Sequence, residues 1–537
     1  MSSSPVVYHN ATVYTADAAA PTAQAFAVHD GRFVAVGAAD VPATGPGVSH
    51  VDVGGRTVVP GFVDAHAHLH ELGRALRRAD LSGASSPDAV VDRLRAYAAE
   101  HDRGSGAWLR GHGWDQTDWT PPRFPSRTTL DAAFPERPVW LTRTDVHAGW
   151  ANTAALEATV GLDRLRRLDD PPGGHIHRHD DGAPSGVLVD AAMSLVTDHI
   201  PPPSAAADDR ALRTALTHTA AHGITTLHDA GVEQPELRRF RRLVDADACP
   251  LRISAMVLGG TDTFDRFCER GPYHHPSGRL DVASTKFFAD GALGSRGAAL
   301  LTDYADAPGE RGLLRHDPPA FREAVRTAVE AGFQVNTHAI GDRAARRVLD
   351  AYAAVQAESP APMRRPRIEH AQVVAPADRA RFGALGVIAS VQPDHAASDA
   401  RWVADRLGPD RLEAAYAWPA LRAAGARLAF GSDAPVETLG PLRAFHAAVT
   451  RQSTPDGRTL SPALPRPVAL RAHTRDAAHA VGRADAVGTI TPGTRADWVV
   501  LSHDPMTGPA DAIPDIDVVA TYLDGRCVHA GPDWPDP

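Results

Sequence analysis

The central part of the chain alternates short apolar segments with Ala/Arg-rich helical stretches. Helical patterns such as RALRTALTHTAAHG and PAFREAVRTAVEAG separate several of the apolar segments. Strands that alternate with helices form parallel sheets, and eight of them fit a (β/α)8 TIM-like barrel. We therefore expect an α/β fold with a barrel at 61–484. Its eight predicted strands are 61–69, 223–230, 251–259, 284–291, 332–341, 366–372, 386–393 and 427–435.

The two ends of the chain follow a different pattern. Residues 1–60 and 485–537 contain short runs that alternate apolar and polar residues, as half-buried strands do. An Asp-Gly pair, typical of a tight hairpin turn, occurs at residue 30 and again at residue 524. Neither segment makes a convincing domain alone, so we expect the two to form one composite β-sandwich.

The spacing after the first barrel strand is too long for a single helix. This spacing predicts an insertion at about 100–200, within the barrel region. The insertion is rich in Pro and Gly, and it contains five of the nine tryptophans, namely Trp108, Trp114, Trp119, Trp140 and Trp150.

Charge and composition exclude several classes of partner. The net charge of −10 and the pI of about 6.2 argue against binding to nucleic acid or to an anionic membrane. The N-terminus lacks a signal-peptide pattern, no apolar run is long enough to span a bilayer, and three cysteines lack a metal-type spacing. We expect a cytoplasmic protein that binds a small-molecule substrate. Because barrels of this kind often dimerise, a homodimer is possible.

A single lysine, Lys286, stands among 55 Lys and Arg residues. A general preference for arginine explains the bias, since surface exchanges of Lys for Arg are nearly neutral. The exchange is not neutral where an amine must lose its proton, because guanidinium stays charged. Lys286 therefore marks a position where a nucleophilic amine is needed, unless it survived by chance at a packed site.

Metal-ligand residue types recur at the C-terminal ends of the predicted strands. Active sites of such barrels lie at this face and collect residues from several strands. In the first strand, His66 and His68 are two residues apart, so both imidazoles point to the same side. The full set is His66, His68, Lys286, His338, His370 and Asp433.

These residue types suit a metal-dependent hydrolase. Imidazole and carboxylate bind Zn²⁺ and similar ions. A neutral Lys286 amine can add CO₂ to form a carbamate (a carboxylated lysine), whose two oxygens can bridge two metals. A metal-activated water would be the nucleophile, and Asp433 would act as general base for it and general acid for the leaving nitrogen.

Ten segments, spread over nearly the whole chain, carry a more specific resemblance. The chain resembles the YtcJ-like branch (amidohydrolase family 3) of the amidohydrolase superfamily, and TITPGTRADWVVLSHDP (489–505) looks like that family's return strand into the β-sandwich. The segments are PGFVDAHAHLH (60–70), GHGWDQTDW (111–119), RTDVHAGWANTAAL (143–156), APSGVLVDAAM (183–193), HGITTLHDAG (222–231), KFFADGALGSRGAAL (286–300), NTHAIGDRAARRVLDAY (336–352), RIEHAQ (367–372), SVQPDH (390–395) and GSDAPVETLGPL (431–442).

The resemblance implies a role for each predicted ligand. His66 and His68 would bind the more buried metal, and His338 and His370 the more exposed one. Carbamylated Lys286 would bridge one or two divalent ions per chain, most simply Zn²⁺. One position departs from the family, which usually has glycine where this chain has Val146.

The substrate pocket is less well defined by the sequence. The loop Trp114, Asp115 and Gln116 and the segment around Asp145 and His147 are candidate substrate contacts, with a structural tryptophan and a capping aspartate as the alternative. Arg296 could hold a carboxylate or form an ordinary ion pair. His228 and His395 could support the ligands without binding metal themselves, but we interpret both as structural.

The leading hypothesis is an amidohydrolase that acts on carbon–nitrogen bonds other than peptide bonds. Its substrate would be an N-substituted formamide or an N-acyl amine with an apolar or aromatic group. The same site could instead serve a deaminase, a cyclic-amide hydrolase or a non-hydrolytic lyase or isomerase, because the fold does not choose among them. A silent metal-binding scaffold is a further alternative, which the intact ligand set argues against.

Overall fold

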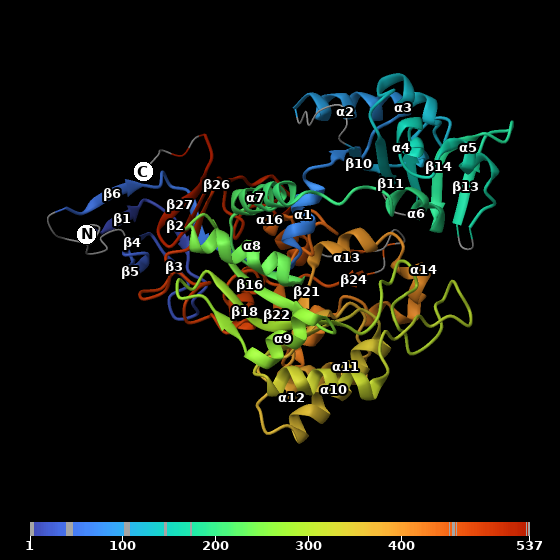
Figure 1. Ribbon diagram of the computed structural model, residues 1–537. Coiled ribbons are helices and arrows are strands. Elements are labelled where there is room, and N and C mark those ends of the chain that lie inside the picture. Colours follow the sequence, from blue (N-terminus) through green and yellow to red (C-terminus); the bar gives the residue numbers. More distant parts are fainter. Residues whose placement is uncertain are drawn as a thin grey trace. The chain divides into compact units, whose positions relative to one another are not determined.

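The computed structural model describes residues 5–38, 47–100, 108–143, 148–171, 174–450, 452–453, 457, 459–532 and 534. The chain divides into two compact units, one formed by Met1–Leu72 with Arg213–Pro537 and the other by Gly73–Leu212. Both can be followed by colour and label in Figure 1. The predicted boundaries near residues 60 and 485 stay a prediction.

Eight parallel strands form the barrel sheet of the first unit. Each overlaps one of the eight predicted segments, so the α/β barrel is confirmed, although β18 begins before its segment and β15 ends beyond its own. A short strand, β17 (Tyr273–His274), adds to β18 in antiparallel orientation. In sheet order the barrel strands are β8 (Phe62–Ala67), β15 (Ile224–Val232), β16 (Arg252–Leu258), β18 (Leu280–Phe288), β19 (Gln334–Ala339), β20 (Arg367–His370), β21 (Ile388–Val391) and β22 (Arg427–Phe430).

The first and last barrel strands meet just beyond their C-terminal ends. The Asp433 amide donates to the His66 carbonyl at 2.7 Å, and the His68 amide donates to the Ala434 carbonyl at 2.9 Å. Gly431 allows this approach, because a Cβ atom there would lie 2.5 Å from the His66 nitrogen. The closing backbone bonds therefore bring three of the predicted ligands together.

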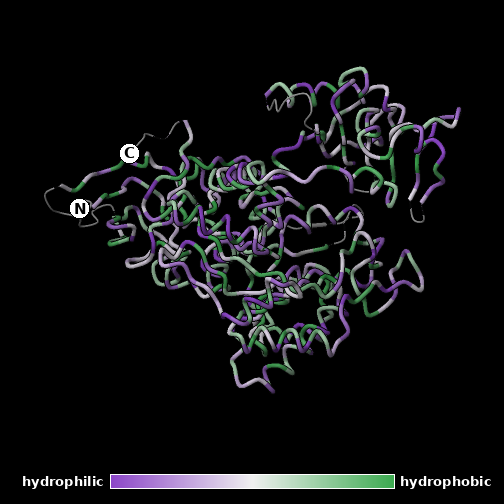
Figure 2. The backbone as a smooth tube through the Cα atoms, viewed as in Figure 1, coloured by the Kyte–Doolittle hydropathy of each residue, from purple (hydrophilic) through white to green (hydrophobic). Residues whose placement is uncertain are grey.

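Helices flank the barrel strands along the chain. Helix α10 is typical of them, since its buried residues, Phe321, Val325, Ala328 and Val329, recur at helical spacing. Figure 2 shows the hydropathy of each residue along the backbone. The helices that follow the insertion are α7 (Ala205–Ala221), α8 (Gln234–Asp245), α9 (Asp262–Arg270), α10 (Pro318–Glu330), α11 (Asp342–Glu358), α12 (Pro376–Leu385), α13 (Pro393–Asp399), α14 (Val403–Leu407), α15 (Trp418–Ala423), α16 (Pro441–Val449), α17 (Arg466–Ala472) and α18 (Arg475–Ala480).

The terminal segments share one sheet, as predicted. Its order is β27-β26-β25-β7-β2-β3, so strands from both ends of the chain lie side by side. A second sheet, β5-β4-β1-β6, comes from the N-terminal segment. The strands are β1 (Val6–His9), β2 (Thr12–Tyr14), β3 (Thr22–Ala23), β4 (Ala25–His29), β5 (Arg32–Gly37), β6 (Ser49–Asp52), β7 (Thr57–Pro60), β25 (Trp498–Leu501), β26 (Val518–Leu523) and β27 (Arg526–Ala530).

Both predicted Asp-Gly turns connect antiparallel strands. Asp30 and Gly31 have φ of 47° and 72° between β4 and β5, and Asp524 and Gly525 have φ of 50° and 74° between β26 and β27. Positive φ at both central positions is the conformation that favours Asp-Gly in two-residue hairpins. Aromatic side chains from both ends of the chain fill the core between the sheets, where Trp498 stacks on Tyr522 with ring centroids 4.1 Å apart.

The second unit has its own mixed sheet and its own core. The sheet order is β13-β14-β12-β11-β10-β9. Trp114, Trp119 and Trp150 lie in one buried cluster, and Trp140 lies in another. The elements are β9 (Ala79–Asp80), α2 (Pro87–Glu100), β10 (Leu109–Trp114), α3 (Arg127–Ala133), β11 (Val139–Arg143), β12 (Ala148–Ala151), α4 (Thr153–Glu157), α5 (Leu162–Arg167), β13 (Gly174–Arg178), β14 (Pro184–Asp190) and α6 (Ser194–Thr197), and α1 (Leu69–Ala75) crosses the boundary between the units.

Two further observations concern the whole described chain. Every helix in the described ranges is too short or too polar to cross a lipid bilayer. The three cysteines, Cys249, Cys268 and Cys527, are free thiols.

Candidate metal centre

The six predicted ligand residues converge at the C-terminal end of the barrel. The Lys286 Nζ lies 3.1 Å from the His66 Nε2, and the His68 Nε2 lies 3.1 Å from an Asp433 carboxylate oxygen. The imidazole ring of His370 has its centroid 5.0 Å from that of His66 and 4.5 Å from that of His338. Side chains from five different strands or strand ends therefore surround one point.

Two groups of ligand atoms within this cluster are close enough to hold an ion. The first is His66, His68 and Asp433, and the second is His370, His395 and Asp433; in each group the atoms lie within 4.8 Å of one another. His395, which we interpret as structural from the sequence, lies on α13 with its Nε2 3.7 Å from an Asp433 carboxylate oxygen. That nitrogen is buried and has no hydrogen-bond partner among the described residues, which fits a metal ligand.

His338 lies in the cluster but outside these two groups. Its Nε2 lies 3.4 Å from the Gly291 carbonyl and 3.4 Å from an Asp290 carboxylate oxygen. Its predicted role as a ligand therefore stays a prediction. The imidazole that joins His370 and Asp433 in the second group is that of His395.

The backbone is strained at two of the predicted ligands. His370 has φ of 72° and Asp433 has φ of 58°, in the left-handed region that residues with a Cβ rarely adopt. Such conformations cost about 1–3 kcal/mol each and cluster at functional sites. His370 is the last residue of β20, and Asp433 follows the end of β22 by three residues, so both side chains are presented at the barrel mouth.

Burial keeps most of the imidazoles neutral. It lowers the pKa of His66 to about 4 and that of His338 to about 3, with Lys286 adding to both shifts. The pKa of His370 is also well below its ordinary value, mainly through burial. His68 differs, because its contact with Asp433 outweighs burial and raises its pKa. Neutral imidazole is the form that binds metals.

The pKa values of the two other predicted ligands, Lys286 and Asp433, are also lowered. Burial lowers the pKa of Lys286 to about 8, against the opposing effect of nearby carboxylates. Burial alone would raise the pKa of Asp433, but the hydrogen bond to His68 and the nearby imidazoles of His66, His370 and His395 together outweigh it, and the net pKa lies well below the ordinary value. Near neutral pH the site thus offers a carboxylate and an amine that is partly unprotonated.

A buried ion pair lies behind His66 and was missed in the sequence. Glu369 approaches the His66 Nδ1 at 2.5 Å, and Arg367 approaches the other Glu369 oxygen at 2.8 Å. Arg367 also donates to the Ala65 carbonyl at 2.6 Å and to Ser390 at 2.8 Å. The signal was present in the motif RIEH, since two charged residues in a fully buried strand require partners.

Asp290 was also missed, although it lies in the quoted motif KFFADG. Its carboxylate accepts hydrogen bonds from the amides of Ala299, Ile340 and Gly341 at 2.8–3.0 Å. Burial raises its pKa to about 7 against the effect of those amides. Asp290 therefore ties the loop after β18 to the end of β19, beside His338.

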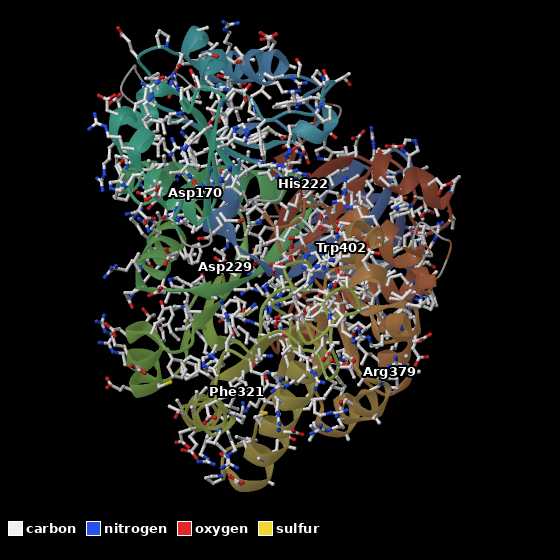
Figure 3. All side chains as sticks on the ribbon, turned by 90° about the vertical axis from the view of Figure 1, so that its right-hand side faces the viewer. Asp170, His222, Asp229, Phe321, Arg379 and Trp402 are labelled. Carbon is white, nitrogen blue, oxygen red and sulfur yellow. The ribbon has the colours of Figure 1, made fainter. Side chains whose placement is uncertain are left out.

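Asp229, which is labelled in Figure 3, is a further buried carboxylate. It lies on β15 and accepts a hydrogen bond from the Leu69 amide at 3.2 Å. Burial raises its pKa to about 7, and nearby His68 opposes the shift. The barrel therefore places two buried carboxyl groups near predicted ligands, Asp229 near His68 and Asp290 beside His338.

The predicted pocket residues of the insertion lie in the second unit. Trp114 is fully buried in its core and donates its indole N–H to the Leu141 carbonyl at 3.1 Å, which favours the structural interpretation. Asp115 forms an ion pair with Arg143 at 3.0 Å, and Gln116 begins a short 3-10 helix. Asp145 and His147 lie outside the described residues.

Arg296, in the loop after β18, forms the ordinary ion pair that was its alternative interpretation. Its guanidinium contacts both Asp306 oxygens, at 3.1 and 2.8 Å. His228 is fully buried, and its Nδ1 lies 3.1 Å from Arg367.

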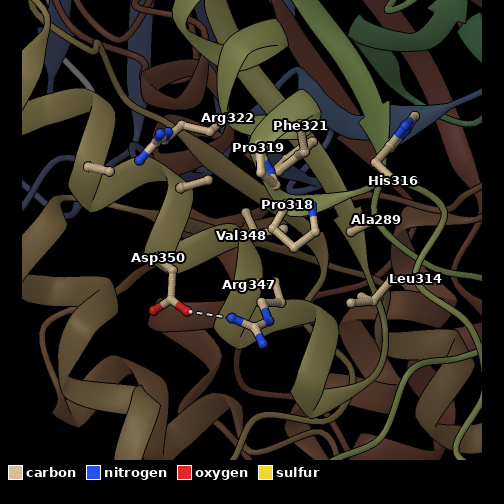
Figure 4. A pocket seen from close by; sticks show the side chains of 12 residues that line it. Ala289, Leu314, His316, Pro318, Pro319, Phe321, Arg322, Arg347, Val348 and Asp350 are labelled. Atoms are coloured by element: carbon tan, nitrogen blue, oxygen red, sulfur yellow. Dashed lines mark ion pairs between the residues drawn. The ribbon is translucent and has the colours of Figure 1, made fainter.

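A pocket of about 220 Å³ lies between α10 and α11 (Figure 4). Apolar side chains such as Phe321, Leu314 and Val348 line it, and an Arg347–Asp350 ion pair lies at its edge. Its lining residues include none of the predicted ligands, so it is a separate feature of the barrel's outer helices.

The comparison with known families decides the classification. The profile of the amidohydrolase family matches residues 50–529, which is most of the chain. The chain belongs to the amidohydrolase family. Together with the convergent ligand groups, this membership makes it a metal-dependent hydrolase of the family's third, YtcJ-like group.

Individual relatives cover nearly the whole chain. The putative amidohydrolase YtcJ of Bacillus subtilis is 32% identical over 97% of this chain and 99% of its own length. An N-substituted formamide deformylase of Arthrobacter pascens is 32% identical over 96% of each chain. Among solved structures, an uncharacterized metal-dependent hydrolase from Pyrococcus horikoshii OT3 is 27% identical, with a TM-score of 0.76 over 95% of this chain and 99% of its own.

Proposed function

We propose that this hydrolase cleaves the C–N bond of an amide, with N-substituted formamides or N-acyl amines as its substrates. The observation that carries the proposal is the convergence of buried neutral imidazoles, an amine of lowered pKa and a carboxylate at the barrel mouth. The similarity to the Arthrobacter deformylase supports the choice of substrate class.

The donor set suits two divalent ions. His66 and His68 would hold one ion and His338 and His370 the other, and Asp433 would be a further ligand. The imidazole of His395 lies 3.7 Å from Asp433 and has the same chemistry. Imidazole and carboxylate together favour Zn²⁺. When bound, the ions would polarise the substrate carbonyl and activate a water molecule as nucleophile.

Lys286 would link the two ions as a carbamate. Its unprotonated Nζ would attack the carbon of CO₂, forming an N–C bond and releasing one proton, and the product would carry one negative charge shared by two oxygens. Burial favours this reaction because it lowers the pKa of the amine to about 8. Arginine cannot replace this function, which accounts for the single lysine of the chain.

Asp433 would move the proton. Its low pKa keeps it ionised and ready to accept a proton from the attacking water. It would then deliver that proton to the leaving nitrogen as the C–N bond breaks, giving a carboxylic acid (formate from a formamide) and an amine. Full turnover by Asp433→Asn would contradict this role.

The test begins with metal content per chain, measured by elemental analysis of protein purified without chelator and with bicarbonate. We expect about two divalent ions in the wild type and a loss of metal and of amide hydrolysis in Lys286→Arg. Arg322→Lys, on the exposed side of α10, is the matched control and should keep both. Lys286→Ala should recover part of its metal and activity with a short carboxylic acid such as propionate.

The activity screen would start with N-formyl and N-acyl amines and would measure formate and free amine. We expect the wild type to release formate and amine in equal amounts from an N-formyl amine, and Lys286→Arg to release neither. One ion or fewer per chain, unchanged in Lys286→Arg, would contradict the bridging role. Ammonia release, or conversion without hydrolysis, would contradict the substrate class while leaving the metal centre in place.

A further inference from the structure

The second unit contains a cavity of about 710 Å³ that is rich in arginine. This volume lies within the range of about 300–1,000 Å³ that is typical of small-molecule pockets. Its described lining includes one carboxylate, Asp208, and six guanidinium groups, in a chain whose net charge is −10. The six are Arg74, Arg77, Arg78, Arg110, Arg137 and Arg210.

The guanidinium groups of this pocket differ in how they are paired. Arg74 binds Asp208, with its NH2 nitrogen 3.2 Å and its Nε 3.3 Å from one carboxylate oxygen. Arg110 is half-buried, and its Nε atom is buried without a hydrogen-bond partner among the described residues. Removing a guanidinium donor from water without a partner is unfavourable, so a buried one is normally paired.

Like charges surround Arg110. Burial, followed by the charges of Arg78 and Arg74, lowers its pKa to about 10. Burial and Arg74 lower the pKa of Arg78 in the same way. Charged groups held together against repulsion are stabilised by an anion, and arginine binds carboxylate and phosphate groups through paired N–H donors.

One part of the lining of the same cavity is apolar. It consists of Trp108, Ile200 and the Pro201–Pro203 run, and Tyr97 contributes a further ring. An aromatic and proline surface packs against an apolar ligand body.

We propose that this cavity is a binding site for a small organic oxyanion, with its charged group on Arg78 and Arg110 and its apolar body against Trp108 and the prolines. The site is formed by residues of the second unit alone and does not depend on the proposed amide hydrolysis.

Isothermal titration calorimetry on the full chain would test the site with inorganic phosphate, phenyl phosphate and benzoate. Phenyl phosphate should bind more tightly than inorganic phosphate, because only the former has a ring. Arg110→Gln and Arg78→Gln should each weaken binding at least tenfold. Arg95→Gln, an exposed α2 residue paired with Asp92, is the matched control and should bind as the wild type does.

Two further measurements distinguish this anion site from the metal centre and from a purely structural arginine cluster. Anion binding should persist after chelator treatment, because none of the predicted metal ligands lines the cavity. Anion binding that is lost when metal is removed would belong to the metal centre and would overturn the proposal. The melting temperature of Arg110→Gln without anion should equal or exceed that of the wild type, since the variant removes repulsion. A lower melting temperature, or a wild type that binds none of the three probes, would mean that Arg110 is structural. A change of oligomeric state in Arg110→Gln would assign the cavity to a protein partner instead.

Discussion

Glu369 contacts His66 on the side of the ring that faces away from the other predicted ligands. A carboxylate on Nδ1 fixes the tautomer of an imidazole, so that the opposite nitrogen, Nε2, has a free lone pair for a metal. Arg367 in turn holds Glu369, with both side chains fully buried. The pair therefore determines the orientation and the protonation of His66 without being a ligand itself.

Replacing Glu369 with glutamine should weaken metal binding about 10–100-fold, the usual effect of losing a group that orients a ligand. It should also lower the free energy of unfolding by about 3–5 kcal/mol, because Arg367 loses its buried counter-charge. Competition with a chromophoric chelator measures the first effect, and denaturant unfolding of metal-free protein measures the second.

Asp378→Asn provides the control for Glu369→Gln. Asp378 is likewise a buried carboxylate paired with arginine, at 2.8 Å from Arg346 and 3.1 Å from Arg381, but on helix α12. We expect this variant to lose stability and to keep its metal affinity. Equal metal affinity in Glu369→Gln and the wild type would show that His66 is oriented by the fold alone.

At the scale of elements, a carboxylate in the turn of the hairpin β26–β27 joins it to the barrel. Asp524 lies in the hairpin turn and contacts Arg252 of β16, Arg279 at 3.3 Å and Arg495 at 3.0 Å. Burial raises the pKa of Asp524, but these guanidinium groups, Arg252 above all, outweigh it and the net pKa is lowered. The folded state thus favours the ionised carboxylate.

A lowered pKa in the folded state gives stability that is present above the ordinary value of 3.8 and is lost as the pH falls through the folded-state pKa. Asp524→Asn should therefore lower the free energy of unfolding at pH 7 by about 3 kcal/mol. The difference from the wild type should narrow as the pH falls below 3.8. Asparagine tolerates the positive φ of this turn, so the hairpin itself should persist.

The control for Asp524 is the other Asp-Gly turn. Asp30 has nearly the same φ, 47°, and is exposed, with His29 as its ion-pair partner at 3.4 Å. Asp30→Asn should change stability by less than about 1 kcal/mol, as exposed pairs do. A pH-independent difference between Asp524→Asn and the wild type would mean that the loss is not electrostatic.

The barrel strands were predictable because buried parallel strands appear as short apolar runs, and the hairpins because Asp-Gly specifies their turns. The ligand cluster followed from the rule that strand ends meet at one face. His395 was singled out but was not predicted as a ligand, since it lies on helix α13, whose direction the sequence does not give. The tryptophans of the insertion suggested a substrate pocket, but most of them fill the core of the second unit.

At the scale of the molecule, each unit has its own core and its own candidate ligand. The predicted metal ligands all lie in the unit of Met1–Leu72 and Arg213–Pro537, and the arginine-lined cavity lies in Gly73–Leu212. A ligand stabilises the part of a protein that binds it, by about 2.7 kcal/mol when its free concentration is one hundred times its Kd. The two ligands should therefore stabilise different parts of the chain.

Scanning calorimetry of the full chain should then show two unfolding transitions. Removing metal with a chelator should lower the melting temperature of one transition, and phenyl phosphate should raise that of the other, because separate cores unfold as separate cooperative units. Glu369→Gln weakens metal binding, so it should reduce the shift caused by the chelator and leave the shift caused by phenyl phosphate unchanged. Arg110→Gln should reduce the shift caused by phenyl phosphate and leave the shift caused by the chelator unchanged. A single transition that both ligands shift would contradict this prediction and show that the two units unfold together. Glu369→Gln and Arg110→Gln would then be the evidence that assigns each ligand to its unit.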